Sequence, residues 1–334
     1  MAGVHVATAS QVLNDRSNCW ASDDTRKRIQ EAASQLGYRP NPSARALLLG
    51  RTNIVGLVSP GFSIASAHTR ASGLTDTAAG ADYTVTLSSH ANDSESEDVV
   101  IRRLLDRGVD GLAVYPVDPG PHEELRRLVE SGFPVVTFEG ANLLDFECDD
   151  ISVDAPEIGR LQARHLLELG HRRICLANTT HEARITALCV DGIRQELARA
   201  GAPAPLEMRL PDTVEREFMD AETLLPPMRT FIKKHRGACD AIIGSDYTAS
   251  LAIRILHELG QRIPEDMALI GGGGSVLATF ADVPLTSVTG EDDAVGAQAF
   301  GLLLDRIEGR WKGGCRRLIN PVRLIVRQST QAER

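Results

Sequence analysis

Two groups of residues could act chemically on a partner: a basic N-terminal segment and a run of glycines. Residues 1–51 contain seven arginines and lysines against four acids, a local charge of +3, whereas the whole chain carries −9. A basic segment on an acidic protein suits contact with phosphates at that segment alone, although a short window could also be basic by chance. The glycines at 271–274 could cradle a phosphate, but no Lys-Ser or Lys-Thr follows and the spacing is not GxGxxG.

Motifs of catalysis and metal binding are not found. The sequence has no GxSxG, no HExxH and no paired catalytic carboxylates, so we expect no enzyme, no cofactor and no metal. The six cysteines form no CxxC pair and have no histidine at metal spacing, which indicates reduced thiols in a cytoplasmic protein. No apolar run could span a bilayer, and no secretory signal is recognised at the N-terminus. The cysteines are Cys19, Cys148, Cys175, Cys189, Cys239 and Cys315.

Most of the 334 residues alternate between apolar runs and amphipathic stretches. Strands are predicted at 53–60, 82–89, 108–117, 133–139, 149–154, 172–178, 239–245, 267–272 and 284–289, with closing strand structure in 316–330. Helices are predicted at 94–107, 120–131, 156–169, 183–200, 246–260 and 291–310. This alternation predicts an α/β protein with parallel sheets covered by helices on both faces, and about nine strands favour two sheets over one.

Two helices are predicted before this alternation begins. The first, His5 to Leu13, can turn Ala9, Val12 and Leu13 inward and Val6, Ala7 and Gln11 outward. The second has Ser22 as N-cap, acids in its first turn and Gly37 at its end. Pro40 and Pro42 then interrupt regular structure before a short helix-capable run at 43–49.

Several stretches resemble the lactose-repressor (LacI) family of bacterial transcription regulators. They are GVHVATASQVLN, SDDTRKRIQEAASQLGYRPNPSARALLLGRTNIVGLV, GVDGLAVYPV, DDISVDAPEIGRLQARHLLELGHRRICLAN, CDAIIGSDYTASLAIRILHELGQRIPEDMALIG and VPLTSVTGEDDAVG. The similarity runs from about residue 3 to about residue 330. It implies a periplasmic-binding-protein-like core of two Rossmann-like subdomains joined by three crossovers. It also implies a cleft for a small effector and a homodimer.

The resemblance divides the chain into a partial helix-turn-helix head at 1–40, a hinge helix at 41–51 and a core at 52–330. Subdomain one takes 52–152 and 288–314, and subdomain two takes 153–286 and 318–330. Residue 3 falls in the turn before the family's reading helix, so the family's first helix is missing. Either the true start lies upstream or the head is degenerate, and a start inside a turn favours the former.

The DNA-binding residues follow from the resemblance. Val6, Ala7 and Gln11 would face base edges in the major groove, where the first two can contact a thymine methyl and Gln11 can bond adenine. Gln11 stands where the family commonly has Arg, and the alternative is a solvated helix face. Asn14 would lie near the DNA backbone. In the hinge, Asn41, Ala44 and Arg45 would line the minor groove and Leu47 would wedge into a base step, unless Leu47 only packs the linker.

The effector residues are predicted at strand ends, where open α/β sheets bind ligands. The resemblance places an acid and an Arg for sugar binding at positions that hold Gly273 and Cys189 here. We therefore expect a polar or cationic metabolite in preference to a simple hexose. The candidate effector contacts are Phe62, Ser63, Ser66, Glu139, Arg184, Asp246, Tyr247, Gly273 and Ser275.

The sequence thus predicts a DNA-binding transcriptional repressor whose partners are a double-stranded operator, a small effector and a second copy of itself. The alternative is a cytosolic ligand-binding protein of the same fold whose head no longer binds DNA.

Overall fold

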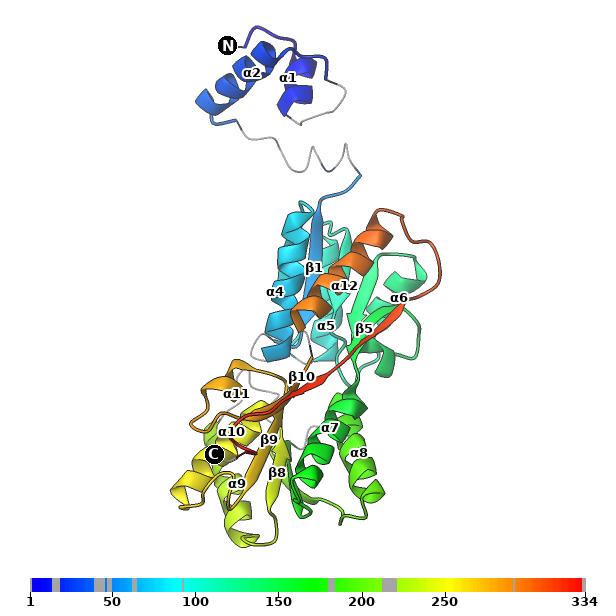
Figure 1. The fold of residues 1–334 in the computed structure, drawn as a ribbon. Coiled ribbons are helices and arrows are strands. Elements are labelled where there is room, and N and C mark those ends of the chain that lie inside the picture. Colours follow the sequence, from blue (N-terminus) through cyan, green and yellow to red (C-terminus); the bar gives the residue numbers. More distant parts are fainter. Residues whose placement is uncertain are drawn as a thin grey trace.

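The computed structural model consists of a small helical head and a larger two-lobed body (Figure 1). It describes residues 2–13, 19–38, 46, 50–61, 65–91, 93–179, 184–211, 221–290 and 292–331. The head contains α1 (Val6–Leu13) and α2 (Asp23–Gln35). Among the described helices, none is long and apolar enough to cross a membrane.

The first lobe, here subdomain one, is built on a six-stranded sheet in the order β11-β5-β4-β3-β1-β2, in which all neighbours run parallel. The central strands β3 and β4 are buried at every residue, as expected for a parallel sheet covered on both sides. Its strands are β1 (Ile54–Ser59), β2 (Thr84–Ser89), β3 (Gly111–Val114), β4 (Val135–Phe138), β5 (Asp149–Val153) and β11 (Arg317–Asn320). Its helices are α4 (Ala65–Gly80), α5 (Ser94–Leu105), α6 (Glu123–Glu130), η1 (Gly140–Asn142) and α12 (Asp292–Ile307).

Subdomain two repeats this plan with the order β12-β10-β9-β8-β6-β7, in which β12 alone of the paired strands runs antiparallel to its neighbour. Its strands are β6 (Ile174–Thr179), β7 (Leu206–Leu210), β8 (Ala241–Gly244), β9 (Ala268–Gly272), β10 (Thr286–Thr289) and β12 (Arg323–Ile325). Its helices are α7 (Ala155–Glu168), α8 (Arg184–Arg199), α9 (Ala221–Lys234), α10 (Asp246–Glu258) and α11 (Val276–Phe280).

One helix pair in each subdomain packs at backbone distance because glycines face the partner. A Cβ at Gly73 in α4 would lie 2.0 Å from the Asp293 carbonyl oxygen, and one at Gly296 in α12 would lie 1.9 Å from that of Arg70. The α7–α8 pair uses Gly159 in the same way, 1.9 Å from the Cys189 carbonyl oxygen. Larger side chains at these positions would push the helices apart.

The chain passes between the subdomains three times, from β5 to α7, from β10 to α12 and from β11 to β12. In Figure 1 the last passage is the red segment that runs between the lobes. The carboxyl ends of the parallel strands therefore meet at the crossovers, which form the hinge of the body.

The predicted class, an α/β core of two largely parallel sheets with a helical head, is confirmed. Five described elements were not predicted: α4, η1, β7, α9 and α11. The predicted start of subdomain two at residue 318 is wrong, because β11 pairs with β5 in the first sheet and the chain crosses only after Asn320. Likewise β10, through Thr289, belongs to the second sheet, so subdomain one resumes with α12 instead of at residue 288.

Candidate DNA-reading head and effector cleft

Helix α1 is held by a small core of its own. Val12 is buried and packs with Ile29 of α2 and with Cys19, while Ala9 and Leu13 lie partly buried at the edge. At its start the Ala7 amide donates to the His5 ring, 3.2 Å away. The inward residues are those that the helical spacing predicted.

The opposite face of α1 is open. Val6 is 80% exposed, Ala7 is exposed and Gln11 is half-buried. All three predicted reading residues thus lie on one face, and their contact with DNA stays a prediction.

Helix α2 fixes the segment that leads into it. The Ser22 hydroxyl accepts from the Thr25 amide at 3.4 Å, which satisfies one of the free donors of the first turn. Arg26 donates to the carbonyl oxygens of Cys19 at 2.9 Å and Ala21 at 3.3 Å. This arginine therefore holds the approach to α2 through two of its donors.

Several predicted site residues lie outside the described part of the chain. They are Asn14, Asn41, Ala44, Arg45, Leu47, Phe62, Ser63 and the side chain of Ser66.

In the body, Glu139 lies immediately after β4 at the hinge and is 8% exposed. Its carboxylate accepts from the Arg70 guanidinium at 3.1 Å and from the Val153 amide at 3.2 Å. Arg70 also donates to Asp292 at 2.8 Å. This Arg70 cluster, defined by Arg70, Glu139 and Asp292, ties α4 to the first crossover through Val153 and to the second through Asp292.

Burial and the neighbouring charges both shift the pKa values in this cluster. Burial raises the pKa of Glu139 to about 7, although the neighbouring Arg70 lowers it. Burial lowers the pKa of Arg70, but the adjacent Tyr115, Glu139 and Asp292 outweigh it, so that pKa is raised and Arg70 stays charged. The Tyr115 hydroxyl is buried beside them without a hydrogen bond to a described residue. The Glu139 carboxylate is thus occupied within the protein, and its contact with an effector stays a prediction.

Asp246, at the start of α10, is also buried and internally bonded. Its carboxylate accepts from the Ser275 amide at 2.6 Å and from the Ser287 hydroxyl at 2.6 Å. It therefore anchors the glycine-rich loop that follows β9. A Cβ at Gly271 would lie 2.2 Å from Asp246 Oδ1, so this approach requires glycine.

The glycine-rich loop has a backbone that an acidic residue would not adopt easily. Gly273 has φ +123° and Gly274 has φ +61°, and a Cβ at Gly274 would lie 1.9 Å from Thr289 Oγ1. The amide of Gly273 donates to the Val288 carbonyl at 3.0 Å. Because the loop amides are used within the protein, the structure does not support the phosphate cradle considered for residues 271–274.

The remaining predicted cleft residues belong to subdomain two. The Arg184 amide, at the start of α8, donates to the Asp118 carboxylate of subdomain one at 2.5 Å, while its side chain is exposed. Tyr247 packs against the apolar core, and the buried Ser275 hydroxyl has no hydrogen bond to a described residue. Burial, with a smaller effect from the nearby Glu139 carboxylate, raises the pKa of Cys189 to about 12, so this thiol is neutral.

Three residues of the hinge were missed from the sequence: Arg70, Asp292 and Asp118. Their partners are 69, 222 and 66 positions away along the chain, so no local pattern reveals the pairs. The sequence feature that could have pointed to Arg70 was its position in segment 65–80, where it stands among small residues and no helix or strand was predicted.

A head with an open helix face, joined to a body whose two lobes meet at a polar hinge, defines a regulator that couples ligand binding to DNA binding. Residues 1–41 match bacterial regulatory proteins of the lacI family, and residues 163–330 match the periplasmic binding protein-like domain. An HTH-type transcriptional regulator from the aml 5′ region of Streptomyces limosus is 30% identical over 98% of this chain and 92% of its own. The HTH-type transcriptional repressor PurR of Edwardsiella ictaluri is 28% identical over 98% of this chain and 94% of its own.

Solved structures with the same fold are found as well. The Lac repressor dimer bound to operator and the anti-inducer ONPF has a TM-score of 0.83, with 21% identity over 99% of this chain and 97% of that one. The complex of the transcriptional regulator CelR with cellobiose has a TM-score of 0.71, with 25% identity over 98% and 97% of the two chains. The chain belongs to the lacI family, and it is an HTH-type transcriptional regulator with a periplasmic-binding-protein-like effector domain.

Proposed function

We propose that this regulator is a homodimeric repressor that reads its operator through the open face of α1 and changes its DNA affinity when a small molecule binds between the subdomains. The observation that carries this proposal is the exposure of Val6 and Ala7 on a helix whose other face is packed.

In the major groove, the apolar side chains of Val6 and Ala7 suit thymine methyl groups, and Gln11 suits the adenine edge, where its amide can donate and accept. In the predicted hinge helix at 41–51, the contacts of Asn41, Ala44, Arg45 and Leu47 would widen and bend the minor groove between two half-sites. Reading of two half-sites requires two heads, and hence a dimer.

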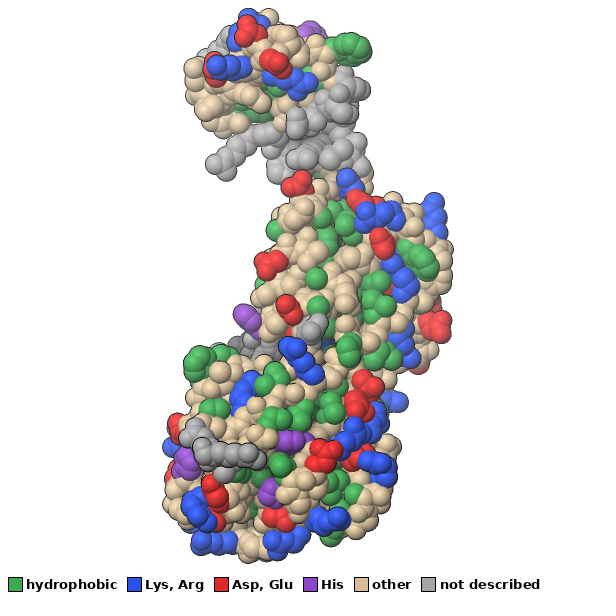
Figure 2. Space-filling view, viewed as in Figure 1, with side chains coloured by type: hydrophobic (Ala, Val, Ile, Leu, Met, Phe, Trp, Pro, Cys, Tyr) green, Lys and Arg blue, Asp and Glu red, His purple; other side chains and the backbone are tan. Residues whose placement is uncertain are grey.

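The surface of subdomain two supports pairing with a second copy. Val276, Leu277 and Phe280 of α11 are 65%, 44% and 80% exposed, and hydrophobic side chains gather over this helix in Figure 2. An exposed apolar patch of this kind is a common mark of a protein interface. Sedimentation of the Phe280→Ser variant as a monomer, with the wild type as a dimer, is the expected result.

The cleft chemistry supports an effector other than a simple hexose. Gly273 offers no acid, and Glu139 and Asp246 use their carboxylates inside the protein. Among the described candidate ligand contacts, the exposed Arg184 side chain and the Ser275 hydroxyl are not occupied in this way. Unpaired sugar hydroxyls would each cost about 1–3 kcal/mol in such a pocket. Thermal-shift screening against sugars, nucleosides and amines tests this expectation, and strong stabilisation by a common hexose would contradict it.

Selection from a pool of random duplex DNA tests the function itself. The wild type should enrich a site with two symmetric halves, and Gln11→Ala should lose preference at one base pair of each half. Gln30→Ala, on the exposed side of α2, is the matched control and should enrich the wild-type site. Failure to enrich any sequence would favour the alternative, a ligand-binding protein whose head does not bind DNA.

A further inference from the structure

A cavity of about 230 Å³ lies beside the first crossover, and its lining differs from the predicted effector residues. Subdomain one contributes Asn142, Ser152, Arg317 and Ile319 to its wall, and subdomain two contributes Pro156 and Leu188. None of the residues predicted to contact the effector lines it. We call this cavity the hinge pocket.

Arg317 gives the hinge pocket a positive group. Strand register pairs Arg317 with Asp150 and Ile319 with Ser152, so alternate side chains of two neighbouring strands form this wall. The Arg317 guanidinium donates to the Ala141 carbonyl oxygen at 2.5 Å, and among the described residues no carboxylate lies within ion-pair distance of it. The Asp150 carboxylate accepts instead from the Thr137 hydroxyl at 2.7 Å. A guanidinium has five donors, so several stay available to a ligand.

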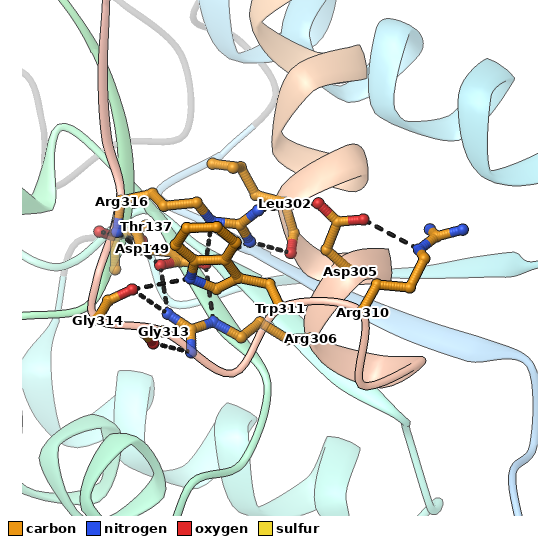
Figure 3. A network of polar contacts seen from close by, with 10 residues as sticks. All are labelled: Thr137, Asp149, Leu302, Asp305, Arg306, Arg310, Trp311, Gly313, Gly314 and Arg316. Carbon is orange, nitrogen blue, oxygen red and sulfur yellow. Dashed lines mark hydrogen bonds and ion pairs between the residues drawn. The ribbon is translucent and has the colours of Figure 1, made fainter.

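The strand that carries Arg317 is firmly held. The neighbouring Arg316 and Arg306 both donate to the Asp149 carboxylate, at 2.8 Å each, and Trp311 stacks over Arg316 with its ring centre 5.0 Å away (Figure 3). Because this network fixes β11 against β5 and α12, the backbone of Arg317 is placed before any ligand arrives. Such preorganisation lowers the entropy lost on binding.

The other wall residues indicate which kind of chemical group a bound anion carries. Leu188, Ile319 and Pro156 are apolar, whereas Asn142 and Ser152 can donate hydrogen bonds. The carboxylate of Asp154, also in the wall, accepts from the Glu157 amide at 3.0 Å and lies 3.5 Å from Arg160, which it shares with Glu157. The volume is below the roughly 300–1,000 Å³ of pockets for drug-sized ligands.

We propose that the hinge pocket is a second ligand site that binds a small aliphatic monocarboxylate. The carboxylate pairs with the Arg317 guanidinium, and the hydrocarbon end lies against Leu188 and Ile319. Since both subdomains form the wall, an occupant stabilises one relative position of the two lobes. Its effect on DNA affinity rests on the proposed function, whereas its binding does not.

The test is titration of the full chain by calorimetry with the carboxylate series from propionate to hexanoate. The corresponding amides serve as uncharged probes, and inorganic phosphate serves as an anion without an apolar end. Arg317→Gln removes the charge, and Leu188→Trp fills the cavity. Arg323→Gln, an exposed arginine on β12 outside the pocket, is the matched control.

At least one carboxylate should bind the wild type and the Arg323→Gln variant. Arg317→Gln should weaken it by about tenfold to a hundredfold, as expected for a hydrogen-bonded charge. The amides should bind as weakly as this variant does, and Leu188→Trp should abolish binding. The proposal is overturned if no carboxylate binds at millimolar concentration, if phosphate binds equally well, or if Arg317→Gln leaves affinity unchanged. Operator binding is measured separately, so loss of the pocket assignment leaves the proposed function standing, and the reverse also holds.

Discussion

Replacement of Arg70 by methionine should destabilise the protein more than any other single change at the hinge. The side chain of Arg70 is 6% exposed and is the shared partner of two carboxylates, at 3.1 Å from Glu139 and 2.8 Å from Asp292. Methionine keeps a long unbranched side chain but leaves both acids buried without a cation. Removal of one partner from a buried ion pair costs about 3–5 kcal/mol of unfolding free energy, and we expect a loss of that size at pH 8.

The loss should depend on pH. Burial raises the folded-state pKa of Glu139 to about 7, above the 4.5 of an unperturbed carboxyl, so the folded state takes up a proton between these values. The contribution of this group to stability is therefore present below pH 4.5 and is lost as pH rises toward 7. Without Arg70, which lowers the pKa of Glu139, the folded-state value rises further. The variant should then be closer to the wild type at pH 6 than at pH 8.

Urea unfolding across this pH range measures the effect, with thermal unfolding as a second readout. The double variant Arg70→Met/Glu139→Gln should recover part of the loss, because it removes one of the two unpaired charges. A loss below 1 kcal/mol at pH 8, or one that does not change with pH, would refute the assignment of Arg70 as the ionic tie between the crossovers.

Three further results are expected. Glu139→Gln alone should lower the free energy of unfolding only slightly at pH 8, since the amide oxygen can still accept from Arg70. It should also flatten the fall in stability from pH 4.5 to 7. An unchanged pH profile of denaturation would contradict this. Asp118→Ala should remove the cap on α8 and cost about 1 kcal/mol, and small-angle scattering should report wider separation of the lobes than in the exposed control Asp106→Ala. Leu47→Ala should weaken specific DNA binding and reduce the bend angle in a gel-phasing assay, and no change in either would remove the proposed wedge.

The strands and most helices of the body could be predicted because each carries its own periodic signal. Strands such as β3 and β4 are mainly apolar runs between turn residues. Helix α4 has no such signal, since Leu74 is the one large aliphatic residue in ASAHTRASGLTDTAAG and its packing depends on a glycine contact with α12. Helix α9 contains Pro226 and Pro227, which argue locally against a helix, so the packing of its apolar face decides the structure.

The site was partly predictable for a related reason. The carboxyl ends of parallel strands lie at one edge of each sheet, and this placement together with the family resemblance singled out Glu139 and Asp246 as candidates. What those carboxylates bond to depends on distant residues, Arg70 and Ser287, which no local pattern identifies. The backbone of Gly273, with φ +123°, is likewise a product of the folded loop and not of its composition.

The central claim is that the open face of α1 distinguishes one DNA sequence from others. Fluorescence anisotropy at one fixed salt concentration can compare the affinity for the selected operator with that for a scrambled duplex of equal length. We expect a ratio of about 10³ or more for the wild type. We expect a ratio about tenfold smaller for Gln11→Ala, with the affinity for the scrambled duplex unchanged. Equal affinity of the wild type for both duplexes, or a Gln11→Ala variant with the full ratio, would contradict the reading role of α1.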